Sequence, residues 1–239
     1  MRLRTLMMGA AATLAMAPAA FAERGADGQV NVILWQAPST MNPYLSSGTK
    51  DIIAASMTIE PLASFDPTGK VVARLAAEVP SLENGGIAED LKSVTWKLQP
   101  GLKWSDGSAL TAADVVFTAN YCMDPKGGCS QLAKFEGIEK VEAVDDLTVK
   151  VSFTTPRPDP FSAFVGGQSP ILQKAQFEKC IGEAAPTCTE QNFSPIGTGP
   201  FKVVEFRTND VISFAANTEY RDPAKPAFAT LTMKGGGDA

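Results

Sequence analysis

The stretch that decides the fold runs from Trp96 to Thr118 and reads W-K-L-Q-P-G-L-K-W-S-D-G-S-A-L-T-A-A-D-V-V-F-T. It overlaps an alternating segment, Val94 to Leu98, whose apolar side chains share one face, which predicts a half-buried strand. Pro100-Gly101 and Ser105-Asp106-Gly107 then predict turns, since proline breaks the strand ladder and Gly107 is free to take a positive φ.

A helix is expected directly after these turns. Thr111 is placed to cap its amino terminus, and Asp114 falls at the third helical position, where a carboxylate suits the free amides of the first turn. The apolar face of this helix runs through Val115, Val116 and Ala119. The stretch holds no nucleophile, base or metal cluster, so its chemistry alone indicates a scaffold of strand, turn and helix.

The same order of elements resembles the signature of family 5 of the extracytoplasmic solute-binding proteins, which serve peptide, dipeptide and nickel ABC importers. A second fingerprint, S-P-I-G-T-G-P-F-K at Ser194 to Lys202, resembles the segment where the chain of that family returns from a small inserted domain to the first lobe. The resemblance implies a mixed α/β to α+β chain with a periplasmic binding protein-like fold, of type II and of the large three-domain subgroup.

The resemblance also implies a division of the chain. Residues 1–22 are expected to be a signal peptide, 23–60 the first segment of lobe one, 61–189 an inserted small α+β domain, and 190–239 the return to lobe one. The sequence ends in Gly235-Gly236-Gly237-Asp238-Ala239, after a last predicted strand, Ala229 to Met233, for which no neighbouring strand is apparent. We therefore expect an amino-terminal fragment whose second lobe is missing.

The first 22 residues have the features of an export signal. Arg2 and Arg4 form a positive start, and the apolar run Leu6 to Ala17 is short for a bilayer span. Ala20-Phe21-Ala22 matches a small-x-small cleavage pattern, so the mature chain is expected to begin at Glu23 in the periplasm. The alternative is a retained membrane anchor.

Composition excludes several function classes. The chain has 239 residues, a formal net charge of −5 and no histidine. The absence of histidine excludes a Ser-His-Asp triad, a Cys-His dyad and histidine-based metal sites within this chain. The negative charge argues against nucleic-acid binding, because phosphate backbones attract basic surfaces.

The four cysteines fall into two local pairs, Cys122 with Cys129 and Cys180 with Cys188. In an exported protein, an even count at short spacing predicts two disulfides, each stapling a polar loop at the end of a predicted helix. The alternative is a four-thiolate zinc site, but the spacings contain no C-x₂-C pair.

The candidate ligand-binding residues are Ser46, Ser47, Gly48 and Thr49. They follow a predicted buried strand, Val30 to Trp35, and the family resemblance places such a small-residue loop at the ligand cleft. Hydroxyls and free amides suit hydrogen bonding, and glycine admits a close backbone approach or a positive φ. The alternative is a helix start, with Thr49 capping the run Ile52 to Ile59.

Other segments predict scaffold elements. Val141 to Val144 and Leu147 to Phe153 predict a hairpin, and its Asp145-Asp146 turn is expected to be solvated rather than catalytic or metal-binding. Phe201 to Phe206 and Val211 to Ala215 predict a second hairpin. Ile171 to Ile181 predicts a helix with Pro170 at its first turn.

The function implied by the resemblance is capture of a peptide or similar solute for an ABC permease and ATPase, by a monomer without cofactor or enzymatic activity. Two alternatives remain open from the residues. One is a periplasmic sensor or chaperone-like binding protein without a transporter. The other is a secreted hydrolase, although the mature chain contains no Ser-x-x-Lys motif and its carboxylates are scattered along turns.

Overall fold

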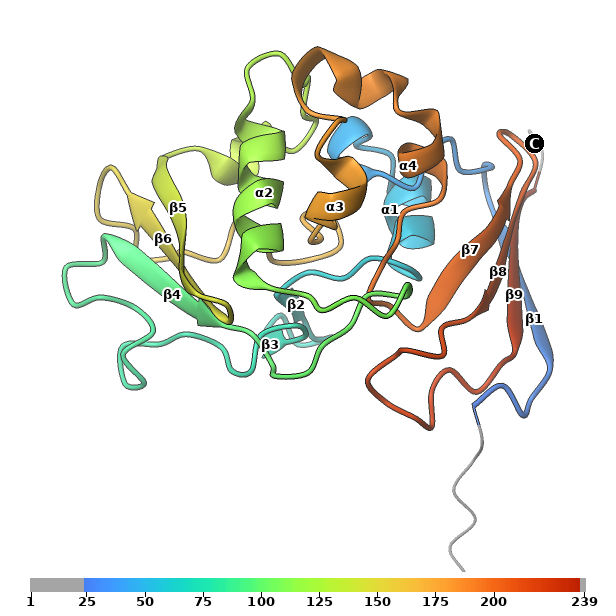
Figure 1. Cartoon of the computed structure of the whole chain (residues 1–239), viewed down its shortest axis with the longest axis horizontal. Helices are drawn as coiled ribbons and strands as arrows, with labels where there is room; N and C mark the ends of the chain where they lie inside the picture. The colour runs from blue at the N-terminus through green and yellow to red at the C-terminus, as the bar shows by residue number, and fades with distance from the viewer. Residues whose placement is uncertain (1–23, 237–239) are drawn as a thin grey trace, which may run out of the picture.

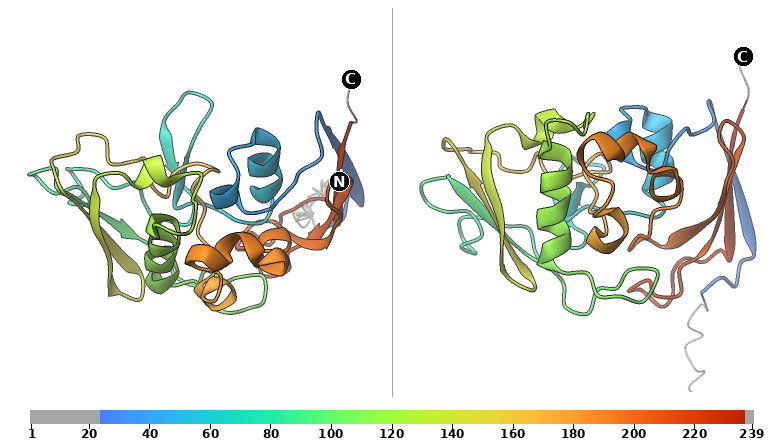
Figure 2. Two further views of the ribbon diagram at one scale, coloured as in Figure 1. Left: turned by 90° about the horizontal axis from the view of Figure 1, so that it is seen from above. Right: turned by 45° about the horizontal axis from the view of Figure 1, so that its top comes forward.

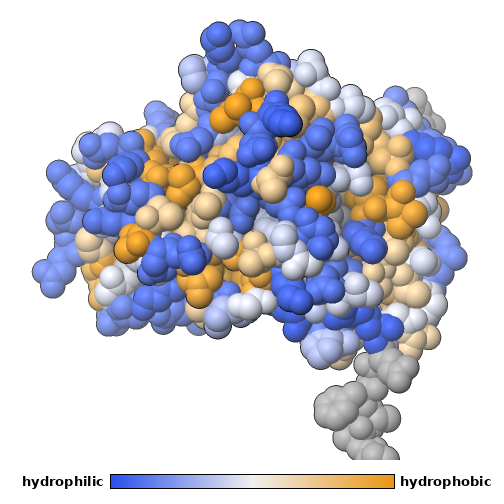
Figure 3. All heavy atoms as spheres, in the orientation of Figure 1, coloured by the Kyte–Doolittle hydropathy of each residue, from blue (hydrophilic) through white to orange (hydrophobic). Residues whose placement is uncertain are grey.

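The computed structural model of the chain describes residues 24–236, so the predicted signal peptide at 1–22 lies outside the described residues. A four-stranded sheet forms one end of the molecule and a three-stranded sheet forms the other, with the helices between them (Figures 1 and 2). Figure 3 shows a mainly hydrophilic face with scattered apolar patches, one of them over the four-stranded sheet. Within residues 24–236, no helix is both long and apolar enough to cross a bilayer.

The four-stranded sheet joins the two ends of the described chain. Its order is β1-β9-β8-β7, with β1 parallel to β9 and the other pairs antiparallel. The strands are β1 (Gln29–Leu34), β7 (Phe201–Phe206), β8 (Val211–Ala216) and β9 (Thr230–Gly235). The predicted hairpin of 201–215 is therefore confirmed.

Two expectations about this sheet are wrong. The last strand, β9, has neighbours on both sides, and its apolar residues Leu231 and Met233 are buried. Its parallel partner β1 lies far away in sequence, so local patterning did not reveal the pairing. The segment Val30 to Trp35 is not buried, because β1 is an edge strand that leaves Ile33 77% and Trp35 57% exposed.

The central stretch forms the predicted strand and helix. The three-stranded sheet has the order β4-β6-β5, and α2 packs against β5 and β6. Thr111 caps α2, and its backbone N–H donates to Asp114 Oδ2 at 2.9 Å, as expected of a capping box. The elements are β4 (Ser93–Lys97), β5 (Ile138–Asp145), β6 (Thr148–Phe153) and α2 (Ala112–Met123), and a small two-stranded sheet joins β2 (Ala63–Phe65) to β3 (Val71–Ala73).

The helix predicted over Ile171 to Ile181 is wrong, since only α3 (Lys174–Phe177) is helical there, and Ile171 and Leu172 precede it in a non-helical segment. Tertiary hydrogen bonds replace the helical ladder. The N–H of Ile171 donates to the Glu60 carbonyl at 2.9 Å, and the N–H of Leu172 donates to Thr118 Oγ1 at 2.9 Å. The remaining short helices are η1 (Pro43–Leu45), α1 (Thr49–Ala55), η2 (Leu132–Phe135), η3 (Gly182–Thr187) and α4 (Thr189–Phe193).

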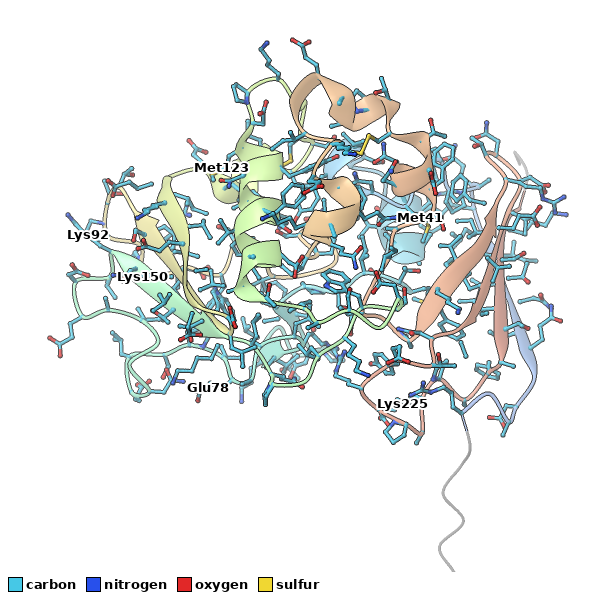
Figure 4. All side chains as sticks on the ribbon, in the orientation of Figure 1. Met41, Glu78, Lys92, Met123, Lys150 and Lys225 are labelled. Carbon is cyan, nitrogen blue, oxygen red and sulfur yellow. A yellow bond between two sulfur atoms is a disulfide. The ribbon has the colours of Figure 1, made fainter. Side chains whose placement is uncertain are left out.

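The buried side chains form two clusters. The larger one lies among α2, the three-stranded sheet and the loops around them, and it includes Trp96, Trp104 and Tyr121. The smaller one lies between α1 and the four-stranded sheet, where Figure 4 labels Met41. The assignment of 23–60 and 190–239 to lobe one, and of 61–189 to an inserted domain, stays a prediction.

The chain passes between these predicted regions near Thr58 and again near Gly199, and the two segments lie side by side. Their close contact explains the glycines of the Ser194 to Lys202 motif. The N–H of Gly199 donates to the Thr58 carbonyl at 2.7 Å, and the N–H of Phe201 donates to the Met57 carbonyl at 3.0 Å. A Cβ atom on Gly197 would lie 1.9 Å from the Thr58 oxygen. Glycine is required because the returning chain passes directly against the departing one.

A largely buried ion pair joins the same two segments of the chain. Arg221 makes two hydrogen bonds to the Glu60 carboxylate, at 2.7 and 2.8 Å, and Thr198 Oγ1 donates to the same carboxylate at 3.1 Å. The two side chains of the pair are only 23% and 11% exposed, Arg221 and Glu60 respectively. Such a bidentate pair fixes geometry as well as charge.

Candidate solute-binding site

A pocket of about 380 Å³ lies at the carboxyl ends of β1 and β9. Because these strands are parallel, their carboxyl ends meet at one edge of the sheet, which is where α/β proteins place their ligands. Two lining segments approach each other closely, since a Cβ on Gly235 would lie 2.4 Å from the Ala37 nitrogen. The lining residues are Trp35, Gln36, Ala37, Lys50, Asn209, Asp210, Lys234 and Gly235.

The pocket combines an aromatic side chain with charges of both signs. Trp35 is more than half exposed and offers an apolar face to a solute. The charges are those of Lys50, Lys234 and Asp210. Lys50 also pairs with Asp51 at 2.9 Å, and Asp210 lies 3.4 Å from Arg207. Sequence reasoning missed this set, because its members come from the ends of β1 and β9, from α1 and from the β7–β8 turn.

The predicted loop Ser46 to Thr49 lies at the start of α1, immediately before the pocket residue Lys50. Ser46 is engaged internally: its hydroxyl donates to Asp51 Oδ2 at 2.6 Å and accepts from the Gly48 N–H at 3.0 Å. Ser47 and Thr49 are exposed, whereas Ser46 and Gly48 are partly buried. The loop contributes no side chain to the pocket lining.

Two details of the helix start differ from expectation. The amino-terminal cap of α1 is Gly48, and Thr49 is already the first helical residue. Gly48 has a φ of −69°, so no positive φ requires glycine there, although a Cβ would lie 3.0 Å from Asp51 Oδ2. The helix also ends at Ala55, before the expected Ile59.

The carboxylate of Asp51 binds several groups around the start of α1, and sequence reasoning missed this residue. Its carboxylate is 1% exposed and receives the backbone N–H of Ser39 at 2.6 Å and the Lys50 ammonium at 2.9 Å. It therefore ties the segment that follows β1 to the Ser46 loop. Burial raises the pKa of Asp51, but the hydrogen bonds from Ser46, Lys50 and Ser39 outweigh it and hold the pKa below 3.8.

Asp51→Asn is expected to lower the free energy of unfolding by about 1–3 kcal/mol at pH 7, because a neutral amide loses the charge-assisted bonds. The folded pKa is depressed, so the charge stabilises the fold above the unfolded pKa, and this contribution is lost as the pH falls through the folded pKa. Urea unfolding of both proteins should show a constant difference from pH 7 to about pH 5 and a shrinking one in more acid buffer. If the difference in the free energy of unfolding between the two proteins did not change with pH, the role assigned to the charge of Asp51 would be contradicted.

Asn42 precedes Pro43 in the segment between β1 and the candidate loop, and it is fully buried. Its side-chain amide donates to the Tyr121 hydroxyl at 2.9 Å and to Asn192 Oδ1 at 2.8 Å. Its own Oδ1 accepts the N–H of Tyr44 at 3.1 Å. Asn42 therefore fixes the turn against α2 and α4 instead of facing a solute.

Both predicted disulfides are present in the structure. Cys122 is bonded to Cys129 with a Cα–Cα distance of 5.1 Å, and Cys180 to Cys188 with 5.8 Å. The two disulfide-closed loops lie against each other, since Lys126 of one pairs with Glu183 of the other at 3.0 Å.

The paired aspartates of the β5–β6 turn have structural roles: Asp145 accepts the Leu147 N–H, and the Asp146 carbonyl accepts the Ala112 N–H. Residues 24–236 contain no group of three side chains suited to hold a metal ion.

The chain has the fold of a type II periplasmic binding protein. Its mixed α/β architecture and the pocket at the carboxyl ends of parallel strands both agree with this class. Residues 70–239 match the bacterial extracellular solute-binding proteins, family 5 Middle. The chain belongs to this family.

Relatives are named as binding proteins, not as enzymes. Glutathione-binding protein GsiB of Pectobacterium atrosepticum is 31% identical over 198 residues, which cover 82% of this chain and 36% of that protein. Its Escherichia coli K12 counterpart is 27% identical and is covered over 40% of its length by 93% of this chain. The chain thus spans between 36% and 40% of the length of these relatives.

Solved structures share the fold. The oligopeptide-binding protein AppA from Bacillus subtilis, in complex with a nonapeptide, superposes with a TM-score of 0.74 at 26% identity, over 89% of this chain and 40% of that one. NikZ from Campylobacter jejuni, in complex with Ni(L-His), gives 0.71 at 25% identity, over 87% of this chain and 38% of that one.

Proposed function

We propose that the protein is the solute-binding component of an ABC importer in the periplasm, and that it captures peptides or solutes of similar size. The observation that carries this proposal is the pocket at the carboxyl ends of β1 and β9 in a chain of this family. Its volume of about 380 Å³ falls within the range of small-molecule sites. Relatives are named for glutathione, itself a peptide, or were solved with a peptide bound.

The proposed mechanism is capture without bond chemistry. Trp35 provides an apolar contact, and Lys50, Lys234 and Asp210 pair with charged groups of the solute. Ser46, Ser47, Gly48 and Thr49 offer backbone groups at the edge of the site, and the exposed Ser47 and Thr49 also offer their hydroxyls. A second lobe closing over the solute would bury it, and the closed form would be the one delivered to the permease and its ATPase.

Calorimetric titration of the complete protein with glutathione and with a pool of synthetic tripeptides tests the proposal. Saturable binding without hydrolysis of the peptide is the expected result. Release of cleaved products by the purified protein would overturn the binding role in favour of a hydrolase. No heat with either probe would exclude peptides as the solute class.

Trp35→Ala is expected to weaken solute affinity about tenfold or more, because exposed aromatic side chains in pockets commonly supply a large share of the binding energy. The melting temperature should hardly change, since Trp35 is 57% exposed. Phe65→Ala is the matched control, as Phe65 is 54% exposed and does not line the pocket. Equal affinity in both variants would remove Trp35 from the site.

A further inference from the structure

Besides Asp51, a second buried residue binds the segment that leads into the loop proposed to meet the solute. Gln131 is only 6% exposed, and its side-chain amide donates to two carbonyls, that of Pro43 at 3.2 Å and that of Ser46 at 3.1 Å. The backbone N–H of the preceding Ser130 donates to the Tyr44 carbonyl at 2.8 Å. Three carbonyls of the segment 43–46 are thus bound by two adjacent residues.

These two residues follow directly on the Cys122–Cys129 disulfide. The bond joins the segment that carries Ser130 and Gln131 to the end of α2, where Figure 4 labels Met123. On the helix side of the bond, the Tyr121 hydroxyl accepts a hydrogen bond from the Asn42 side chain. Both arms of the disulfide therefore contact the one segment, residues 42–46, that leads into the candidate loop.

We propose that Gln131, held in place by the Cys122–Cys129 disulfide, is a positioning residue that sets the affinity of the solute site. Its side-chain amide donates to two carbonyls outside the pocket lining, and it acts through the backbone of 43–46, which presents Ser46 to Asp51 and Gly48. The inference rests on the proposed function for its effect on affinity, while its effect on the loop can be measured without any solute.

Gln131→Met tests it, because methionine keeps the length of the side chain and removes both donated hydrogen bonds. Gln173→Met is the matched control. Gln173 is also buried, at 3% exposure, and its amide also donates twice, to Asp106 Oδ2 and Ser108 Oγ. None of the groups bonded to the Gln173 side chain belongs to residues 42–49.

The first measurement is hydrogen exchange of the complete protein without solute. Amides of Leu45, Ser46 and Gly48 are bonded within the loop and should exchange about tenfold faster in Gln131→Met than in wild type or Gln173→Met. The double variant Cys122→Ser with Cys129→Ser should show the same local acceleration, and it serves as the second probe if Gln131→Met does not fold. Unchanged loop exchange would overturn the positioning role whether or not a solute binds.

The second measurement is calorimetry with the tripeptide pool. Gln131→Met should bind about 3- to 30-fold more weakly, the effect of losing one or two hydrogen bonds that hold the site, while Gln173→Met should match wild type. Faster loop exchange with unchanged affinity would overturn the link between this loop and the solute. Absence of binding by wild type would count against the proposed peptide class, and the exchange result would still decide the positioning role.

Discussion

Replacing Gly197 with alanine should lower the free energy of unfolding by about 3–5 kcal/mol, a loss at the upper end for single substitutions. The added Cβ would lie 1.9 Å from the Thr58 oxygen and 2.5 Å from the Thr58 carbonyl carbon. To remove this steric clash, the two adjacent chain segments would have to move apart, and this movement would lengthen the hydrogen bond between Gly199 and Thr58. Thermal or urea unfolding monitored by circular dichroism measures the loss.

Gly127→Ala is the control for this experiment. Gly127 also has a negative φ, but its nearest contact for a new Cβ is 3.4 Å, which is ordinary van der Waals contact. The control should stay within about 1 kcal/mol of wild type. An equal and small effect at both glycines would show that the crossing relaxes freely.

The second large effect is expected at the ion pair between Glu60 and Arg221. Arg221→Met removes two hydrogen bonds and leaves the Glu60 carboxylate buried with only the Thr198 hydroxyl as its side-chain partner. Breaking a buried pair in this way costs about 3–5 kcal/mol, and the partial exposure of these side chains reduces the expectation to about 2–4 kcal/mol. Urea unfolding at pH 7 measures it.

Arg207→Met gives the matched comparison. Arg207 contacts Glu205 and Asp210 at 3.7 and 3.4 Å, but its side chain is 57% exposed, so the substitution should change stability by no more than about 0.5 kcal/mol. The double variant Glu60→Met with Arg221→Met should be more stable than Arg221→Met alone, because it leaves no unpaired charge. A double variant that is less stable would contradict this account.

Local sequence predicted the elements whose stabilising contacts are also local. The capping box of Thr111 with Asp114, the hairpin at Asp145 and both disulfides depend on residues close together in the chain. The strand β4 is the exception, since it pairs with the distant β6 and was recognisable only by its alternating apolar pattern. The family resemblance supplied the fold class, since it rests on the order of these same motifs.

The errors concern contacts between distant segments. Ile171 and Leu172 carry an apolar pattern typical of a helix, but Glu60 and Thr118 bind their amides and hold them outside a helix. The neighbours of β9 and the exposure of β1 likewise depend on a pairing between the two ends of the described chain. In the candidate site, the family resemblance indicated the Ser46 to Thr49 loop, whose contact with a solute stays a prediction. Asp51 and Gln131 were missed because they are buried polar residues whose partners no spacing rule indicates.

The crossing at Thr58 and Gly199 has a consequence for how this architecture can change over time. All the buried members of the cluster beneath the four-stranded sheet lie outside residues 59–198. The segment 59–198 enters and leaves at one point, where two backbone atoms are 2.7 Å apart. Recombination could therefore exchange that whole segment through a short junction without changing the sequence of the sheet or of its buried cluster. The contacts of residues 42–46 with Tyr121, Gln131 and Asn192 would have to be kept in the exchanged segment, so these few positions link the two regions while the rest can diverge separately.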